Sequence, residues 1–230
     1  MKILCTLCMR GNSQGIKNKN IISFFGKPLF YYSLISAKKF KKFDEIVVSS
    51  DSKKILKICK KYGVKNLIHR PKILSNHKSG KVPAIKHATI EIEKKLNKKF
   101  DIVVDLDVTC PLRTVNDIKK AVKKIIKDGS CNLVSATYSR KSPYFNIVQK
   151  KNKTITLIKK HNKNFLRRQD TPITFDLNAS IYIWKRDFLI KNPSIFQKKT
   201  SIYIMSKSKS FDIDDLDDLK INKLFFKKKI

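Results

Sequence analysis

The residues best suited to chemistry lie in four short segments, each next to a predicted strand or helix. The first segment, residues 10–20, directly follows the apolar run Ile3–Cys8. Two glycines in a loop at the carboxyl edge of a parallel sheet let backbone N–H groups approach phosphates closely. Arg10 and Lys19 add positive charge where a triphosphate would lie. The segment matches neither the Walker loop nor the dinucleotide fingerprint, so it favours another phosphate ligand.

Two acidic segments could hold a divalent cation. Asp105 and Asp107 come at the end of a predicted strand over residues 101–106, and Asp212 and Asp214 alternate just before the last predicted helix. Carboxylates at the carboxyl edge of a sheet can hold a metal ion against a phosphate. Asp107 is the better candidate of the first pair, because Asp105 is expected to point into the sheet. Asp212 and Asp214 share one side of the chain, which favours a common Mg²⁺ site.

The fourth segment contains paired arginines on a predicted loop. Only 7 of the 52 basic residues are arginine, so the chain uses lysine wherever positive charge alone suffices. Arg167 and Arg168 stand together, and a planar guanidinium can bind a carboxylate through two parallel hydrogen bonds. This pair is therefore a candidate carboxylate site, whereas Arg186 is interpreted as a plain helix-start residue.

The elements that must position these segments alternate between apolar runs and lysine-rich helical patterns. Strands are predicted over Ile3–Cys8, Glu45–Ser50, Asp101–Leu106, Asn132–Thr137, Ala179–Trp184 and Ser201–Met205. Helices are predicted over Lys27–Phe40, Ser52–Tyr62, Val82–Leu96, Val115–Lys127 and Leu216–Phe226. Thr114 with Asp117 forms a capping box, and Gly129 ends the same helix. The alternation predicts an α/β fold with a mostly parallel, doubly wound sheet and helices on both faces.

The middle of the chain interrupts this alternation. Residues 144–158 are predicted to form an irregular antiparallel hairpin around residues 150–153, and a charged loop continues to Asp176. We therefore interpret residues 138–177, approximately, as an insertion on the sheet of a single domain spanning residues 1–230.

Composition limits the classes of function. The formal net charge is +34, but lysine is spread over nearly every segment, which is not typical of a nucleic-acid binder that concentrates arginine in a stripe. Such a field would still attract an anionic small molecule. The five cysteines are odd in number and scattered, so we expect core thiols and no disulfide framework; Cys5 and Cys8 should face opposite ways. No apolar stretch suits export or a membrane span, which predicts a cytoplasmic protein without membrane partners.

Taken together, the segments resemble the acylneuraminate cytidylyltransferase family, also called CMP-sialic acid synthetases, in its bacterial nonulosonate branch. The likeness runs from Ile3 to Leu219 with the motifs in order. It is carried by Arg10–Gly15 with Lys19-Asn20, Gly26–Leu29, Val48–Asp51, Arg70-Pro71, Thr109–Arg113, Arg168–Pro172, Asn178–Tyr182 and Asp212–Asp214.

The resemblance implies a sheet of the nucleotide-diphospho-sugar transferase type and a homodimer built through the central antiparallel insertion. It also implies a Mg²⁺-dependent reaction in which CTP and a nonulosonate yield a CMP-sugar and pyrophosphate. The implied nucleotide-binding residues are Arg10, Gly11, Ser13, Gly15, Lys19, Asn20 and Arg70. The implied sugar-binding residues are Asp107, Arg168, Asn178 and Tyr182. Asp212 and Asp214 would hold the metal, with Asp107 as a further candidate ligand, and Arg10, Lys19 and Asp214 would carry catalysis.

The chain departs from the family pattern at three positions. Gln14 stands where many members have lysine, Cys110 replaces a usual serine, and Asp107 stands where sialic-acid enzymes often have a sugar-directed glutamine. The aspartate keeps open a bacterial relative of sialic acid, such as legionaminic or pseudaminic acid.

Two other classes of function compete with this interpretation. A metal-dependent glycosyltransferase of similar fold could use Asp105 and Asp107 as a D-x-D motif, although it would need neither the 10–20 loop nor Asp212 and Asp214. A basic nucleic-acid-binding protein would use the charge alone and none of the four segments.

Overall fold

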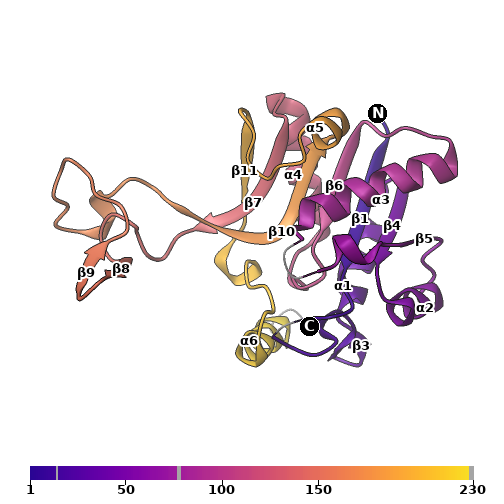
Figure 1. Cartoon of the computed structure of the whole chain (residues 1–230), viewed down its shortest axis with the longest axis horizontal. Coiled ribbons are helices and arrows are strands. Elements are labelled where there is room, and N and C mark those ends of the chain that lie inside the picture. Colours follow the sequence, from indigo (N-terminus) through magenta and orange to yellow (C-terminus); the bar gives the residue numbers. More distant parts are fainter. Residues whose placement is uncertain (14, 77–78, 228–230) are drawn as a thin grey trace.

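The central element of the computed structural model, which describes residues 1–13, 15–76 and 79–227, is a seven-stranded sheet in the order β11-β7-β10-β6-β1-β4-β5 (Figure 1). Its strands are β1 (Ile3–Met9), β4 (Glu45–Ser50), β5 (Asn66–His69), β6 (Ile102–Leu106), β7 (Asn132–Tyr138), β10 (Phe175–Lys185) and β11 (Thr200–Ile204). β10 runs antiparallel to both neighbours and the other pairs are parallel. The predicted mostly parallel α/β sheet is confirmed.

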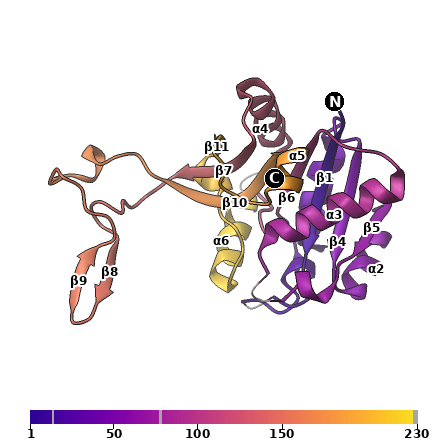
Figure 2. The same ribbon diagram turned by 45° about the horizontal axis from the view of Figure 1, so that its top comes forward.

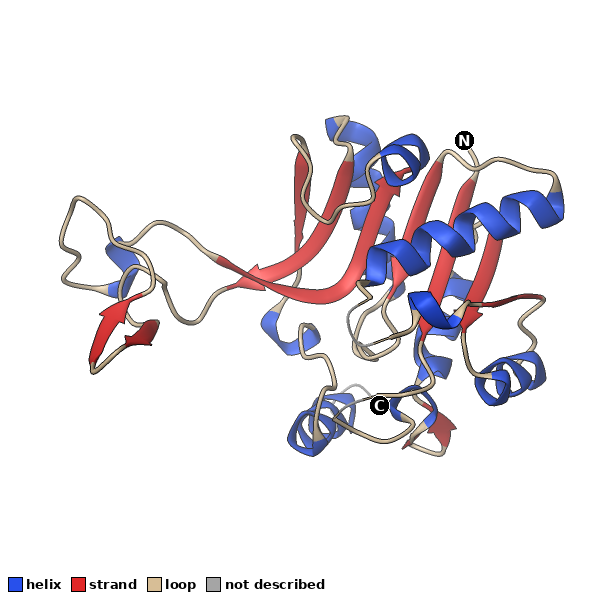
Figure 3. Cartoon of the chain, viewed as in Figure 1, coloured by secondary structure: helices blue, strands red, loops and turns tan. Residues whose placement is uncertain are grey.

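Helices cover both faces of this sheet (Figure 3). Helices α1 (Phe30–Lys39), α2 (Lys53–Lys61) and α4 (Val115–Asp128) bury apolar side chains in one core cluster. Helix α3 (Lys81–Leu96) and the short α5 (Arg186–Lys191) contribute to a second cluster on the opposite face. Central strands such as β6 are buried along their whole length, which explains their nearly continuous apolar sequence.

The predicted start of α4 and the ends of α2 and α4 agree with the structure to within one residue. Ser52 caps α2 by accepting a hydrogen bond from the Ile55 N–H, and Thr114 and Asp117 form the capping box of α4. Gly129 ends α4 in the left-handed conformation at φ 66°, which a residue without Cβ adopts at low cost.

The predicted start of the first helix was wrong. α1 begins at Phe30, because Lys27–Pro28 (β3) pairs with Ser23–Phe24 (β2) in a small hairpin. Phe25 and Gly26 form its turn at φ 47° and 74°, the double positive-φ geometry of a tight two-residue hairpin.

The predicted start of β10 was also wrong by four residues. Its first part, Phe175–Leu177, pairs with the end of β7, and the register then shifts before Tyr182. Ala179 lies within this bulge at φ 52°, a left-handed conformation that alanine rarely adopts. The bulge re-aims the strand next to the carboxyl end of β6.

An arm formed by residues 139–174 projects from the sheet between β7 and β10 (Figures 1 and 2). It carries the predicted hairpin as β8 (Val148–Lys151) and β9 (Thr154–Leu157), with Asn152 in the turn at φ 57°. The arm also contains a single 3₁₀ turn, Arg168–Asp170.

The last helix is α6 (Leu216–Lys227), which packs on β2 and on Leu29 through a third apolar cluster. Arg186 starts α5 as predicted, but it is more than a helix-start residue. Its Nη2 lies 2.8 Å from Glu93 Oε2 on α3, so a largely buried ion pair joins the two helices on one face. No bounds were predicted for this helix, because the six residues of α5 show too little periodicity.

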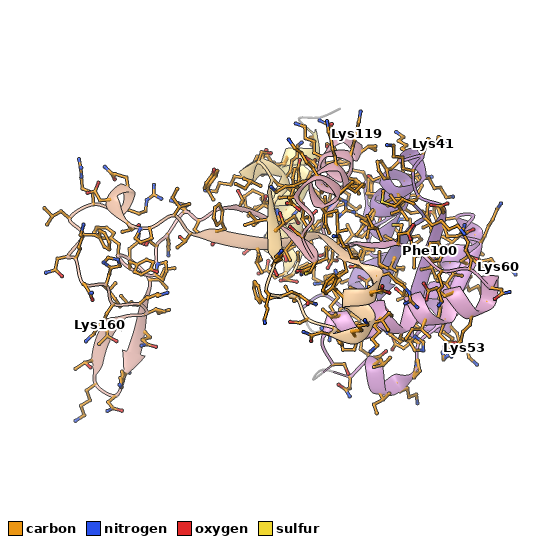
Figure 4. All side chains as sticks on the ribbon, turned by 90° about the horizontal axis from the view of Figure 1, so that it is seen from above. Lys41, Lys53, Lys60, Phe100, Lys119 and Lys160 are labelled. Carbon is orange, nitrogen blue, oxygen red and sulfur yellow. The ribbon has the colours of Figure 1, made fainter. Side chains whose placement is uncertain are left out.

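The free cysteines and the scattered lysines agree with what the sequence predicted. All five cysteines are free, and four of them are buried, whereas Cys8 is half-buried. In Figure 4 the labelled Lys41, Lys53, Lys60 and Lys119 lie around the body and Lys160 lies on the arm, so lysine forms no single stripe. Within the described part of the chain, no helix has the length and apolar character to cross a membrane.

Candidate active site

A cavity of about 600 Å³ opens at the carboxyl edge of the parallel strands, where the loops after β1 and β6 meet the segment before α6. It brings together nine of the predicted site residues, namely Arg10, Ser13, Gly15, Lys19, Asn20, Arg70, Asp107, Asp212 and Asp214. Residues 75–76 and 79–81, which precede or begin α3, complete one wall. Gln14 lies outside the described residues.

The loop after β1 is held by hydrogen bonds from its own side chains and from β4. Asn20 is buried and its Nδ2 donates to the Arg10 carbonyl at 2.9 Å. The Gly11 N–H donates to Asp51 Oδ1 at 2.9 Å, and a Cβ on Gly11 would lie 3.0 Å from the Ser52 Cβ. Gly11 therefore shapes the loop from behind, whereas Arg10 and Ser13 line the cavity.

Arg70 organises the same wall. It is 4% exposed, and its guanidinium donates to the Met9 carbonyl and to Ser75 Oγ, both at 2.9 Å. Its Nη2 also lies 3.5 Å from Asp51 Oδ1. Because these contacts tie the end of β1 to residues 70–75, Arg70 fixes the relative position of two cavity walls.

Segments from the N-terminal and C-terminal parts of the sequence meet at Gly15. A Cβ on this glycine would lie 2.1 Å from the Asp214 carbonyl oxygen, so no other residue fits at this backbone approach. Beside it, Lys19 Nζ contacts Asp214 Oδ1 at 2.6 Å. Ile16 and Ile213 pack in the third apolar cluster underneath. The phosphate loop and the acidic segment before α6 thus form one unit.

Asp212 and Asp214 are suited to a cation. Burial raises the pKa of Asp212 to about 6, and the nearby carboxylates of Asp214, Asp107 and Asp218 act in the same direction. The Ile213 N–H donates to the Thr109 carbonyl at 3.0 Å, which anchors the acidic segment to the loop after β6. Among residues 1–13, 15–76 and 79–227, no group of three or more His, Cys, Asp or Glu could by itself hold a metal ion. Two carboxylates facing a phosphate site nevertheless fit Mg²⁺, which usually takes one or two carboxylates and fills its shell with phosphate and water oxygens.

Asp107 shares a lysine with Asp105. Lys81 Nζ lies 2.8 Å from Asp105 Oδ2 and 2.6 Å from Asp107 Oδ2, while Thr6 Oγ1 donates to Asp105 Oδ1 at 2.7 Å. Burial would raise the pKa of Asp107, but Lys81 and the hydrogen bonds from Thr109 outweigh it and lower that pKa to about 2. Burial would likewise lower the pKa of Lys81, yet the two carboxylates raise it well above its ordinary value.

Sequence analysis missed Lys81 and the structural importance of Arg113. Lysine is the commonest charged residue here, so nothing in the sequence distinguishes Lys81 from the others. Arg113 is buried and donates to the Ser180 carbonyl at 2.7 Å and to Ser33 Oγ at 2.6 Å. It also donates to the Asp107 carbonyl at 3.2 Å, which holds the end of β6 against β10 and α1. The scarcity of arginine was the signal that could have identified it.

Two predicted sugar-binding residues lie behind the cavity wall. Asn178 is 3% exposed; its Oδ1 accepts from Ser135 Oγ at 2.6 Å, and its Nδ2 donates to Ser210 Oγ at 2.9 Å. These bonds brace the β10 bulge. Tyr182 stacks on Trp184, and Lys81 Nζ lies 4.9 Å from the centre of the Tyr182 ring.

Arg168 lies on the arm, away from the cavity of its own chain (Figure 1 locates the arm). It lines a separate pocket of about 140 Å³ together with residues 138–139, 141–142, 169 and 171–174. Its Nη1 donates to the Ser139 carbonyl at 3.5 Å, whereas Arg167 pairs with Asp170 at 3.0 Å. Within one chain, Arg168 and the phosphate loop therefore do not form a single site.

A doubly wound sheet with a glycine-containing loop and acidic residues at its carboxyl edge is typical of nucleotide-binding α/β enzymes. The family model described as "Cytidylyltransferase" matches residues 4–230, so this chain belongs to the cytidylyltransferase family and is a nucleotidyltransferase.

Three proteins illustrate what the chain is similar to. It is 40% identical to the "Post-translational flagellin modification protein B" of Campylobacter coli, over 99% of this chain and 96% of the relative. It is also 40% identical to the "CMP-N,N'-diacetyllegionaminic acid synthase" of Campylobacter jejuni subsp. jejuni, over 96% of this chain and 93% of the relative. The solved structure of CMP:2-keto-3-deoxy-manno-octonic acid synthetase with CTP superposes over the whole of both chains with a TM-score of 0.71 at 14% identity, which supports the fold.

The approach of Gly15 to Asp214 leads to a first prediction. In Gly15→Ala the new Cβ must move about 1 Å or more away from the Asp214 carbonyl, which displaces the phosphate loop. A displacement of this size can lower kcat/KM for CTP by about a hundredfold. Steady-state kinetics at varied CTP measures the effect.

Gly129→Ala is the matched control. Gly129 is also a loop glycine, with φ 66° and open space around it, so its substitution should cost about 1 kcal/mol of stability and leave the CTP kinetics unchanged. Equal kinetics for Gly15→Ala and wild type would contradict the predicted importance of the contact.

Proposed function

We propose that this cytidylyltransferase transfers CMP from CTP to the anomeric hydroxyl of a sialic-acid-like nonulosonate, with a legionaminic-acid-type sugar as the first candidate. The observation that carries the proposal is the single cavity in which a phosphate loop faces Asp212 and Asp214. The 40% identity to the legionaminic acid synthase over nearly the whole chain supports the choice of sugar.

In the proposed reaction the anomeric hydroxyl oxygen forms a bond to the α-phosphorus, and the bond from that phosphorus to the bridging oxygen of the β-phosphate breaks. Pyrophosphate leaves with the electron pair, and the hydroxyl proton passes to water. Arg10 and Lys19 place positive charge beside the triphosphate, and the loop backbone approaches it through Gly15. Their charges stabilise the negative charge that develops on the phosphate oxygens.

Mg²⁺ would be held by Asp212 and Asp214, where it would neutralise phosphate charge as a Lewis acid. Lys19 contacts Asp214 through Oδ1 at 2.6 Å, and the Asp214 side chain is 72% exposed, so a metal ion can reach its other carboxylate oxygen. Asp107 is less suited to the metal, because Lys81 and Thr109 already occupy most of its lone pairs.

The same contact disfavours a glycosyltransferase that would bind a metal through Asp105 and Asp107. An ammonium group at 2.8 and 2.6 Å from the two carboxylates stands where that metal would have to bind. Nucleic-acid binding is disfavoured by the scatter of lysine over the body and the arm. The dependence on CTP and the five free thiols support a cytoplasmic location.

The arm supports a homodimer. Its side chains include exposed apolar groups, with Ile155 and Ile173 both 71% and Leu166 88% exposed. Several large apolar side chains left exposed on one projecting arm favour an interaction site, and self-association through one surface gives a symmetric dimer. Because Arg168 is remote from the cavity of its own chain, we propose that it reaches the cavity of the second copy and binds the sugar carboxylate.

The direct test is a panel of nonulosonates with CTP and Mg²⁺, scored by pyrophosphate release. We expect release with at least one legionaminic-acid-type sugar, because the cavity offers both the phosphate loop and the carboxylate pair. Pyrophosphate release with none of the sugars would refute the proposed function. Transfer from a nucleotide sugar instead would favour the glycosyltransferase.

The metal proposal predicts the behaviour of Asp214→Asn. Loss of one charge-assisted metal contact is worth about 1.5–3 kcal/mol, so the Mg²⁺ concentration for half-maximal rate should rise roughly ten- to a hundredfold. Asp217→Asn is the control, because Asp217 is 82% exposed, pairs with Lys220 and does not line the cavity. An equal Mg²⁺ requirement in both variants would remove Asp214 from the metal site.

The dimer proposal predicts complementation between two impaired variants, assayed at a Mg²⁺ concentration that saturates wild type but leaves Asp214→Asn nearly inactive. Arg168→Ala and Asp214→Asn each damage every site of their own homodimer. If Arg168 acts across the interface, a mixed dimer has one doubly damaged site and one intact site, so an equal mixture should recover about a quarter of wild-type activity. No recovery after verified subunit exchange would place Arg168 in its own chain's site or outside catalysis.

A further inference from the structure

We propose that Lys81 is the resident cation of the Asp105/Asp107 pair and that it fixes Asp107 as the acceptor for an O–H or N–H group of the sugar. Lys81 is thus a positioning residue that determines specificity through Asp107. This inference rests on the proposed function and identifies the part of the sugar that faces β6.

The surroundings of the Lys81 ammonium group support its role as a fixed cation. Its Nζ lies 2.8 Å from Asp105 Oδ2 and 2.6 Å from Asp107 Oδ2, and it lies over the Tyr182 ring at 4.9 Å. The Lys81 side chain is 25% exposed, whereas Asp105 is fully buried. An ammonium group has three donors, and two carboxylates and an aromatic face satisfy them.

The position of Lys81 at the start of α3 does not favour a positive charge. Lys81 is the first residue of the helix, where the helix dipole disfavours a cation, and no acidic residue lies in the first turn of α3. Gly80, the preceding residue, supplies no side-chain cap. The two carboxylates on β6 and its following loop, which belong to the cavity wall, are therefore what holds Lys81 in place.

Asp107 keeps a specific and limited capacity to bind a ligand. Its Oδ1 accepts from the Thr109 N–H at 3.0 Å and from Thr109 Oγ1 at 2.9 Å, while Oδ2 accepts from Lys81. A carboxylate oxygen has two lone pairs, so Oδ2 retains one, and the side chain is 18% exposed on the cavity. A hydrogen-bond donor of the ligand can use that lone pair.

The charge of the cluster decides which part of the sugar lies there. With Lys81 present, one ammonium group is shared by two carboxylates and lowers the formal charge of the cluster from −2 to −1, so a neutral O–H or N–H group of the sugar can bind Asp107. The sugar carboxylate offers only acceptors and therefore lies elsewhere in the cavity. Without Lys81, two uncompensated carboxylates would face an anionic substrate and repel it.

The experiment uses the full-length enzyme with CTP and the best sugar from the panel. Lys81→Met removes the ammonium group and keeps the apolar stem, Asp107→Asn removes the carboxylate charge, and the double variant removes both. Lys86→Met is the matched control, because Lys86 lies on the same helix and donates to the Ile190 carbonyl at 2.7 Å. Sugar binding is also measured by calorimetry with CMP present, which permits no turnover.

We expect Lys81→Met to raise the sugar KM roughly ten- to a hundredfold while the CTP KM changes less than about threefold. The double variant should bind the sugar about as weakly as Asp107→Asn alone, because Lys81 acts on the sugar only through Asp107. Asp107→Asn should weaken sugar binding and leave the Mg²⁺ requirement unchanged. Lys86→Met should behave as wild type.

Three results would overturn the inference. An unchanged sugar KM in Lys81→Met would remove the lysine from the site, and equal increases in both KM values would indicate a merely structural role. A raised Mg²⁺ requirement in Asp107→Asn would make Asp107 a metal ligand. If Lys81→Met does not fold, the sugar affinity and the Mg²⁺ requirement of Asp107→Asn decide whether Asp107 contacts the sugar. Failure of the proposed function is a different result, since wild type would then release no pyrophosphate with any sugar.

Discussion

The candidate site depends on the contact between the loop after β1 and the segment before α6. Gly15 approaches the Asp214 carbonyl so closely that no side chain fits, and Lys19 pairs with the Asp214 carboxylate at 2.6 Å. Residues nearly 200 positions apart thereby face each other across one cavity. Because the loop and the acidic segment are fixed to each other, the phosphate site and the proposed metal site cannot move independently, which is the preorganisation that charge stabilisation in phosphoryl transfer requires.

Charge balance explains much of the remaining polar structure. With 52 basic and 18 acidic residues, carboxylates are scarce, and the buried ones are each paired with a cation or capped. Glu93 pairs with Arg186, and Asp117 pairs with Lys209 as well as capping α4. Asp212 is different, because burial raises its pKa and the neighbouring carboxylates, Asp214 first among them, act in the same direction. The site thus contains negative charge that the protein does not itself neutralise.

Sequence reasoning recovered what short-range patterns encode. The strands, the capping box at Thr114 and the convergence of loops at the carboxyl edge follow from periodicity and from the direction of parallel strands. Lys81 could not be identified from the sequence, because lysine is common throughout the chain. Its role follows only from its distances to Asp105 and Asp107 in the folded structure. The bulge at Ala179 was missed, since a left-handed alanine has no sequence signature. Arg168 was assigned to the sugar without any indication of which copy's cavity it would enter.

The third apolar cluster has a consequence for the motions of the enzyme. Ile16, Phe24, Leu29, Ile213 and Leu219 pack together apart from the two clusters that hold the sheet and its main helices. A small separate cluster can open with a lower free energy than the whole domain. Because the cluster joins α6 to the loop after β1 and to β2, these segments can open together while the sheet stays folded. The free energy that holds this small cluster together, and not the stability of the whole domain, would then limit how long the site stays assembled.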